Sequence, residues 1–203
     1  MSVIDADPDG DTSTREAIML ATFQALCTHG YAGTSISRIA EEFPKSKSLL
    51  YYHYEDKEEL LSDFLAHLLD QLESELHDDV DEAPLERLET LLDLLAPHDP
   101  SEERIRFFQA TMEMRAQAPH EPAYREQFQR TDDLVITVFV DAIEDGIADG
   151  TFRDVDAERI AEFILTSLYG TLDRSVLLED PERLENLRDE LDRYIEETLL
   201  ADD

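Results

Sequence analysis

Three lysines carry the clearest chemical signal in this chain, because they are its only lysines and lie within thirteen positions, at Lys45, Lys47 and Lys57. The side chains between and beside them can donate hydrogen bonds to phosphate oxygens or base edges: Ser46, Ser48, Tyr52 and His53. Ammonium groups and short donors at this spacing predict a surface that grips the phosphate backbone of a nucleic acid. The alternative is that these lysines are ordinary solvated surface residues, but such residues would not all be expected in one segment.

The distribution of charge supports this interpretation. The chain carries 50 acidic and 17 basic side chains, a net charge of −33. Residues 12–57 hold five of each sign, so the whole net charge lies outside them. A neutral, lysine-bearing segment on an acidic body is what a phosphate-facing surface requires. The other acids are spread among periodic apolar segments and indicate charged, folded helices, in a composition typical of proteins from salt-in halophiles.

Helical spacing of apolar residues, with Pro or Gly between segments, predicts an all-α fold. Ser13 and Glu16 form a capping box at the first helix, and Gly30 is expected to end it. Three parts are expected: a loose acidic arm over residues 1–12, a helix-turn-helix domain over 13–57 and a helical ligand-binding and dimerisation domain over 58–203. Nine helices are predicted, over residues 14–28, 35–42, 46–52, 56–76, 85–95, 102–117, 122–147, 157–178 and 181–200.

The helices expected at 35–42 and 46–52 are joined by a turn of three or four residues and form a helix-turn-helix unit, whose second helix fits the major groove of DNA. Thr34 and Ser35 stand at the start of the first of them, where free backbone N–H groups suit a phosphate. Lys57 begins the next helix and supplies a second phosphate grip. The expected core of the unit consists of Ile18, Ala21, Leu26, Tyr31, Ile36, Ile39, Ala40, Leu50 and Tyr51.

This segment resembles the N-terminal domain of TetR-family transcriptional regulators. The matching elements are Thr14-Arg15 before Ile18, Gly30-Tyr31, Thr34 before Ile39-Ala40, Ser46-Lys47, and Leu50-Tyr51-Tyr52-His53-Tyr54 followed by Lys57. The resemblance implies a backbone-gripping role for Tyr51, Tyr52, His53 and Lys57, although Tyr51 also suits the core. It also implies contacts to bases or phosphates from Ser37, Ser46, Lys47 and Ser48.

Two residues of the turn depart from the family pattern. Pro44 and Lys45 stand where members usually have a glycine and an apolar residue. Proline cannot adopt a positive φ and biases the preceding Phe43 away from helix, so the turn geometry is expected to differ locally. Lys45 adds a positive charge at the edge of the groove.

The C-terminal domain is expected to bind a small apolar or amphipathic effector of unknown identity, since family members commonly release DNA on binding one. A cavity between helices is the expected place. Carboxylates there, such as Glu113, Asp132, Asp133 or Asp141, could instead face a cationic effector. Candidate lining residues are Phe107, Phe108, Met112, Phe128 and Phe139, although each also suits an ordinary bundle core.

Apolar and small residues at three- and four-residue steps predict that the last two helices pair with those of a second copy. The candidate interface consists of Phe163, Ser167, Leu168, Gly170, Leu187, Leu191 and Tyr194. A homodimer with two-fold symmetry would place its recognition helices roughly 34–36 Å apart, or a small multiple of that distance. The partner is then a double-stranded DNA operator with an inverted repeat.

Other classes of function find little support in the chain. Cys27 is the sole cysteine, no histidines have ligand spacing, and no catalytic triad, Gly-rich phosphate loop or HExxH sequence occurs, so we expect no enzyme, metal or cofactor. No apolar run is long enough to span a bilayer and no secretory signal is visible, which predicts a cytoplasmic protein. Two alternatives remain open: a helical ligand-binding or interaction module that has lost DNA binding, and an activator instead of a repressor.

Overall fold

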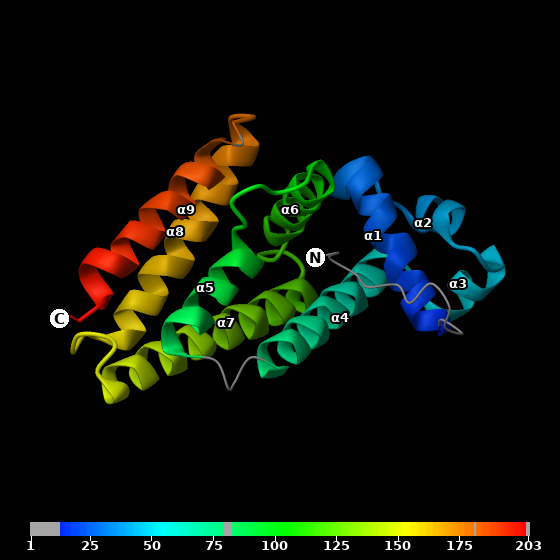
Figure 1. Ribbon diagram of the computed structural model, residues 1–203. Coiled ribbons are helices and arrows are strands. Elements are labelled where there is room, and N and C mark those ends of the chain that lie inside the picture. The colour runs from blue at the N-terminus through cyan, green and yellow to red at the C-terminus, as the bar shows by residue number, and fades with distance from the viewer. Residues whose placement is uncertain (1–12, 79–82, 181, 202–203) are drawn as a thin grey trace. The chain divides into compact units, whose positions relative to one another are not determined.

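The structure is a computed structural model that describes residues 13–78, 83–180 and 182–201, so the predicted arm over residues 1–12 lies outside it. Within these residues it contains helices, one isolated antiparallel bridge between Phe152 and Leu200, and no strand, which confirms the predicted all-α fold (Figure 1). The elements are α1 (Thr14–Gly33), α2 (Ile36–Glu42), α3 (Lys47–His53), α4 (Lys57–Asp78), α5 (Pro84–Leu95), α6 (Glu102–Arg115), α7 (Pro122–Asp149), α8 (Ala157–Leu177), α9 (Glu182–Tyr194) and a short π-helix, η1 (Ile195–Leu199). None of the described helices has a stretch both long and apolar enough to cross a membrane.

Most helices begin and end within a few residues of their predicted bounds. The capping box is present: the Ser13 amide donates to Glu16 at 2.7 Å and the Glu16 amide donates to the Ser13 hydroxyl at 3.2 Å. Gly30 does not end α1 but kinks it, with φ 66° and ψ 175°, a conformation open essentially to glycine alone. One further turn follows the kink and ends at Gly33.

The described residues form two compact units, and α4 and α7 contribute to both. Unit 1 comprises residues 13–70 and 101–129, and unit 2 comprises residues 71–78, 83–100, 130–180 and 182–201. This division differs from the predicted boundary after residue 57, because α6 and the first part of α7 pack with the helix-turn-helix segment.

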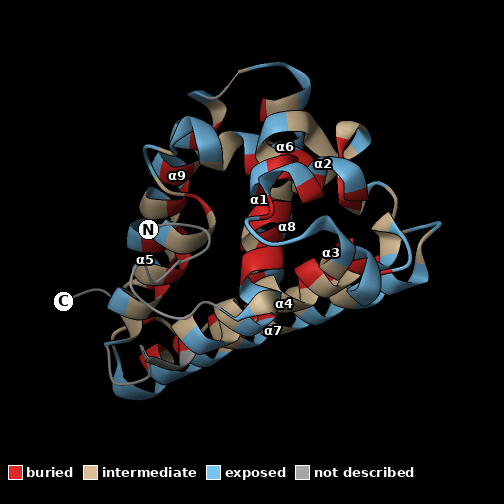
Figure 2. Cartoon of the chain, turned by 90° about the vertical axis from the view of Figure 1, so that its right-hand side faces the viewer, coloured by how far each residue is buried: buried red, intermediate tan, exposed pale blue. Residues whose placement is uncertain are grey.

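Unit 1 is built around α1, which packs against α6 and α2 and is therefore buried around most of its circumference (Figure 2). Phe107 of α6 lies between two other rings, with centroids 5.2 Å from Phe23 of α1 and 6.3 Å from Phe64 of α4. Burial of three aromatic side chains from three helices gives this unit a large apolar contribution to stability. The helix-turn-helix segment is thus anchored on a shared core.

Unit 2 has its own apolar core, formed by α5, α8, α9 and the distal parts of α4 and α7. Phe139 and Ile164 are fully buried in it. Gly146 of α7 allows Phe152 to pack directly on the helix backbone, since a Cβ at Gly146 would lie 2.0 Å from the Phe152 ring. The turn after α7 is therefore held against the helix that precedes it.

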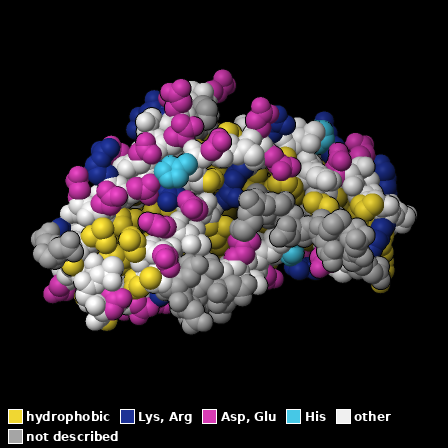
Figure 3. Space-filling model, viewed as in Figure 1, with side chains coloured by type: hydrophobic (Ala, Val, Ile, Leu, Met, Phe, Trp, Pro, Cys, Tyr) yellow, Lys and Arg dark blue, Asp and Glu magenta, His cyan; other side chains and the backbone are white. Residues whose placement is uncertain are grey.

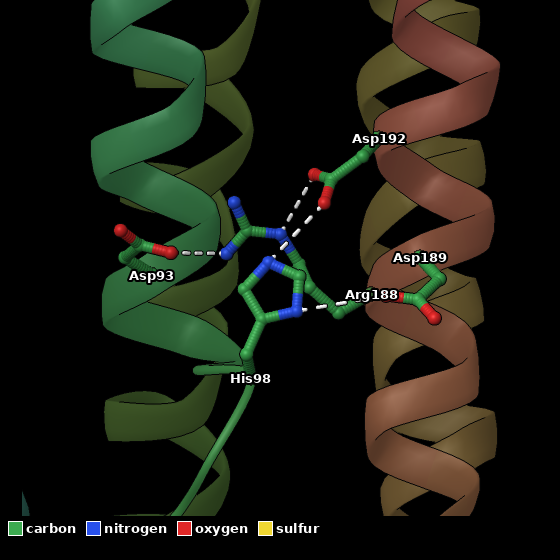
Figure 4. A network of polar contacts seen from close by, with 5 residues as sticks. All are labelled: Asp93, His98, Arg188, Asp189 and Asp192. Carbon is green, nitrogen blue, oxygen red and sulfur yellow. Dashed lines mark hydrogen bonds and ion pairs between the residues drawn. The ribbon is translucent and has the colours of Figure 1, made fainter.

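A charged network joins α5 to α9 inside unit 2 (Figure 4). The buried guanidinium of Arg188 pairs with Asp93 of α5 and, at 2.8 Å, with Asp192 of α9. His98 also approaches Asp192, at 3.3 Å, and Asp189, at 3.7 Å. Burial alone would lower the pKa of Arg188, but the hydrogen bonds that it donates to its two carboxylate partners raise it, so the guanidinium stays charged.

Candidate nucleic-acid interface

The turn between α2 and α3 spans four residues, 43–46, as expected for a helix-turn-helix. Phe43 ends α2 in an extended conformation, with φ −78° and ψ 122°, which confirms the predicted effect of Pro44 on the preceding residue. The Phe43 side chain is buried, and so is Leu50 of α3. These two apolar anchors fix the angle at which α3 leaves the core.

The outer face of α3 is formed by residues one helical turn apart. Lys47, Ser48, Tyr51 and Tyr52 are all exposed, and the fractional exposure of Tyr52 reaches 83%. Such exposure is unusual for an aromatic side chain and leaves its hydroxyl open to a partner. The neighbouring side chains predicted to bind DNA are exposed as well: Lys45, Ser46 and His53.

Tyr51 was expected in the core, with a contact to the DNA backbone as the alternative, and the core prediction is wrong. Its side chain is 52% exposed, and its hydroxyl lies 3.0 Å from the Ser37 hydroxyl of α2 in a hydrogen bond. Adjacent residues of an α-helix point about 100° apart, so Leu50 and Tyr51 cannot both face the same small core. Tyr51 instead shares the outer face with Lys47, and Ser37 lies beside it.

The residues at the start of α2 serve mainly to build the helix. Thr34 is buried, and its hydroxyl donates to the carbonyl of Gly30 at 2.7 Å. Ser35 caps α2 by accepting from the Arg38 amide at 3.3 Å. Thr34, Ser35 and Ser37 were all predicted to contact DNA, and among these three Ser37 is the one with an exposed side chain.

Lys57 lies at the first position of α4, as predicted, but its side chain is directed to Tyr31. The ammonium donates to the Tyr31 carbonyl at 3.1 Å and lies 3.8 Å from the centroid of the Tyr31 ring. This cation–π contact stabilises the junction between α1 and α4. The Lys45 ammonium, on the turn, lies 3.3 Å from the Thr14 hydroxyl.

Asp63 of α4 braces the two ends of the helix-turn-helix segment. It accepts from Arg15 of α1 at 2.8 Å and from the hydroxyl of Tyr54, the residue that follows α3. Burial alone would raise the pKa of Asp63, but the hydrogen bonds from Arg15 and Tyr54 lower it below the ordinary value. The carboxylate is therefore ionised at neutral pH and holds α1 and the end of α3 together.

Glu113 of α6 caps the kink in α1. The Gly30 conformation interrupts the helical hydrogen bonds, and one Glu113 oxygen accepts from the freed amides of Tyr31, at 2.9 Å, and Ala32, at 3.3 Å. From the sequence, Glu113 was expected only as one possible partner of a cationic effector. Its position next to the α1–α2 junction makes it a link between α6 and the helix-turn-helix segment.

The five candidate effector-pocket residues do not gather at one place. Phe107 and Phe128 are buried in the core of unit 1, and Phe108 packs against that core. Met112 of α6 is partly buried, whereas Phe139 belongs to the core of unit 2. The faces of Phe108 and Phe128 are covered by Arg104 and Arg115, whose guanidinium carbons lie 5.2 Å from the respective ring centroids.

The candidate dimer residues divide into two groups. Leu168 and Leu191 are buried and pack inside unit 2. The others line the surface of α8 and α9, and the exposed ring of Phe163 contacts Tyr194 at a centroid distance of 5.1 Å. Those at least partly exposed are Phe163, Ser167, Gly170, Leu187 and Tyr194.

Acidic side chains are scattered over the whole face drawn in Figure 3, with no single acidic block. Within the described residues, no three His, Cys, Asp or Glu side chains are arranged to hold a metal ion.

Cys27 is half-buried, and burial raises the pKa of its thiol to about 11, which keeps it protonated and unreactive at neutral pH.

An all-helical chain with a four-residue turn between α2 and an outward-facing, lysine-bearing α3 is a helix-turn-helix DNA-binding protein. The comparisons with known proteins agree. The family model described as bacterial regulatory proteins of the tetR family matches residues 18–64. The model described as the C-terminal part of BetI-type transcriptional repressors matches residues 84–200.

The chain therefore belongs to the TetR family of transcriptional regulators, which are non-enzymatic DNA-binding proteins. It is similar to a TetR regulator from Haloarcula marismortui, 38% identical with a TM-score of 0.82, which covers 92% of this chain and 98% of that one. The repressor KstR2 of Mycolicibacterium smegmatis is 26% identical over 77% of each chain. A regulator from Saccharomonospora viridis, solved in complex with choline, shares the fold at 22% identity with a TM-score of 0.78, over 93% of this chain and 98% of that one.

Proposed function

We propose that this regulator is a homodimeric repressor whose α3 enters the major groove of an inverted-repeat operator. The outer face of α3 supports this proposal most directly, because it presents an ammonium, a hydroxyl and two phenols with no apolar anchor among them. Lys47 and Ser48, near the start of α3, lie where recognition helices contact base edges. Tyr52, Lys45 and His53 flank them and suit phosphate oxygens.

The surface of α8 and α9 supports dimerisation. Phe163 is 49% exposed although it is a large apolar side chain. Gly170, about two turns further along α8, has no atom within 4 Å of the place where a Cβ would lie. A ring and a glycine at this spacing allow two copies of the helix pair to approach closely in a four-helix interface. Leu168 and Leu191 are buried inside unit 2, where they pack beneath this surface.

We infer further that a small apolar or amphipathic effector releases the operator. Glu113 supports this idea, because a change in α6 would alter the cap that holds the α1–α2 junction. An effector can shift DNA affinity only by its difference in affinity for the two states. An effector bound equally tightly with and without operator would count against this coupling.

The DNA upstream of the regulator's own gene provides the first test of the proposal. A gel shift in molar KCl should show a complex with this DNA that a duplex of scrambled sequence does not form. Failure to bind any duplex while the chain is folded would favour the alternative, a ligand-binding or interaction module that has lost DNA binding.

Dimerisation is tested separately, by sedimentation of Phe163→Glu beside the wild type. A charge at the centre of an apolar interface should give monomers, whereas Glu162→Gln on the exposed neighbouring position should leave the dimer intact. A Phe163→Glu protein that remains dimeric would show that another surface forms the interface.

A further inference from the structure

Two places on the exposed side of α8 carry large apolar side chains. Phe163 lies in the first half of the helix and is half-exposed, and Leu177, the last residue of the helix, is 74% exposed. Leu178, which follows directly, is half-exposed as well. Large apolar side chains gathered at the surface of a folded protein mark sites of association. The residues expected in the dimer interface do not include Leu177 or Leu178, so their exposure needs an explanation of its own.

Phe163 and Leu177 belong to one stripe along α8. Its members follow one another at steps of four and three residues, which keep them on one side of an α-helix. The stripe consists of Phe163, Ser167, Gly170, Arg174 and Leu177. Phe163 and Leu177 each lie seven residues from Gly170, which is about 10 Å along the helix axis at 1.5 Å per residue. The stripe is therefore symmetric about Gly170 in its spacing, with an aromatic ring at one end and an aliphatic side chain at the other.

Charge is missing from the middle of this stripe. Residues 163–172 include no Asp, Glu, Lys or Arg, although 33% of the residues of the chain are charged. Two copies with a net charge of −33 each repel one another, and the repulsion is weakest where neither surface carries charge. The surface at Gly170 is also open, since no atom lies within 4 Å of the place where a Cβ would be. The middle of α8 is thus where a second, equally acidic copy can approach closely.

We propose that the two-fold axis of the homodimer passes beside Gly170, with the two α8 helices antiparallel. Phe163 of each copy then contacts Leu177 of the other, and both contacts form together because Phe163 and Leu177 lie at the same distance from the axis. This inference rests on the proposed homodimer and adds to it the register of the interface. The ring of Tyr194 of α9, 5.1 Å from that of Phe163, widens the apolar platform that receives Leu177 and Leu178 of the second copy.

The other members of the stripe favour the antiparallel register over a parallel one. In a parallel pair each residue meets its own copy, so the two Arg174 guanidinium groups would face one another and repel. In the antiparallel pair Arg174 lies opposite Thr166 of the second copy, an exposed residue whose hydroxyl can accept a hydrogen bond from the guanidinium. The two Gly170 residues meet at the axis, where the lack of side chains lets the helix backbones approach.

Cross-linking between two different variants tests the register. In a Cys27→Ser background, one protein carries Phe163→Cys and the other Leu177→Cys, and the two are mixed, allowed to exchange subunits and oxidised. We expect covalent dimers from the mixture and none from either protein alone. Two copies of position 163, or of position 177, lie roughly 20 Å apart across the axis, whereas a disulfide needs Cα atoms within about 7 Å. The matched control is Asp141→Cys, on the exposed surface of α7, which should give no covalent dimer when mixed with Leu177→Cys.

Opposite charges at the same two positions give a second test that needs no disulfide. Phe163→Glu and Leu177→Lys should each weaken the homodimer at least about tenfold, since a charge then meets an apolar side chain at both contacts. In an equimolar mixture of the two proteins, one contact pairs the introduced charges and the other keeps Phe163 against Leu177, so sedimentation should show dimers again. The control mixture of Phe163→Glu with Leu177→Glu should stay monomeric, because its introduced charges are alike.

The outcomes separate the register from the homodimer itself. A dimeric wild type, with no covalent dimer from the cysteine mixture and no dimer from the mixture of opposite charges, would overturn the register and leave the homodimer intact. Efficient cross-linking of Phe163→Cys with itself would also overturn the register, because the axis would then lie near position 163 or the helices would be parallel. A wild type that sediments as a monomer would refute the homodimer, and the inference with it.

Discussion

The lysines of unit 1 differ in what surrounds their ammonium groups, and so they should differ in what they do. Lys47 projects from the exposed face of α3, whereas Lys57 is held by the carbonyl and ring of Tyr31. Lys47→Ala should weaken DNA binding roughly tenfold across sequences and leave the Tm unchanged. Lys57→Ala should lower the Tm, because the cation–π contact and one hydrogen bond are lost. Thermal unfolding and anisotropy titrations of both variants check this prediction. A fall in Tm for Lys47→Ala, and not for Lys57→Ala, would contradict it.

Asp63 gives unit 1 a defined response to acid. Its pKa is lowered in the folded chain, so its stabilising effect is complete above the ordinary pKa of an aspartate, about 3.9, and is lost as pH falls through the lower folded value. Asp63→Asn should reduce the free energy of unfolding by about 1 kcal/mol at neutral pH, given that Arg15 is half-exposed. Denaturant unfolding at several pH values should show this difference shrinking below about pH 4. A difference that stays constant with pH would rule out the ionised carboxylate as its source.

Among the elements, the kink of α1 and its cap on α6 connect the two parts of unit 1. Glu113→Ala leaves the amides of Tyr31 and Ala32 without their acceptor and should destabilise the chain by about 1 kcal/mol, the usual effect of losing a helix cap. DNA affinity should fall as well, because the turn after the kink leads directly into α2. Glu113→Gln keeps an acceptor oxygen, so its stability and DNA affinity should lie between those of the wild type and those of Glu113→Ala. Gln109→Ala, at an exposed position of α6, is the control for stability and affinity, and a loss as large there would refute the capping role.

The elements themselves were largely predictable from the sequence, whereas the contacts between them were not. Apolar spacing predicted the helix-turn-helix and the confinement of the lysines predicted an exposed α3, because both are local signals. The side-chain contacts of Asp63 with Arg15 and of Glu113 with Tyr31 join residues 48 and 82 positions apart, and nothing in one sequence distinguishes these two acids from the other 48 acidic side chains. Tyr51 could have been placed correctly, since its step from Leu50 on the helix directs it outward.

At the scale of the whole molecule, the net charge of −33 sets the response of DNA binding to salt. Ordinary DNA-binding proteins lose affinity steeply as salt rises, because neutralised phosphates release counterions. An acidic body beside DNA must instead gather cations between the two surfaces, and molar salt screens their repulsion. We predict that log K for the operator is flat or rises with log KCl concentration. Anisotropy titrations from low to molar KCl measure this dependence. A steep negative slope of log K against log KCl concentration, while the protein stays folded, would contradict the prediction.

Site-directed cleavage of DNA tests the docking of α3 most directly. An iron–EDTA group attached to Ser46→Cys, in a Cys27→Ser background that leaves no other thiol, reports which base pairs lie beside the start of α3. We predict two cleavage clusters in the major groove, one in each half of the operator, separated by roughly 34–36 Å or a small multiple of that distance. The same group at Glu126→Cys, on the exposed surface of α7, serves as the comparison. Cleavage from position 126 with none from position 46, on an operator that the protein still binds, would contradict the assignment of α3 as the recognition helix.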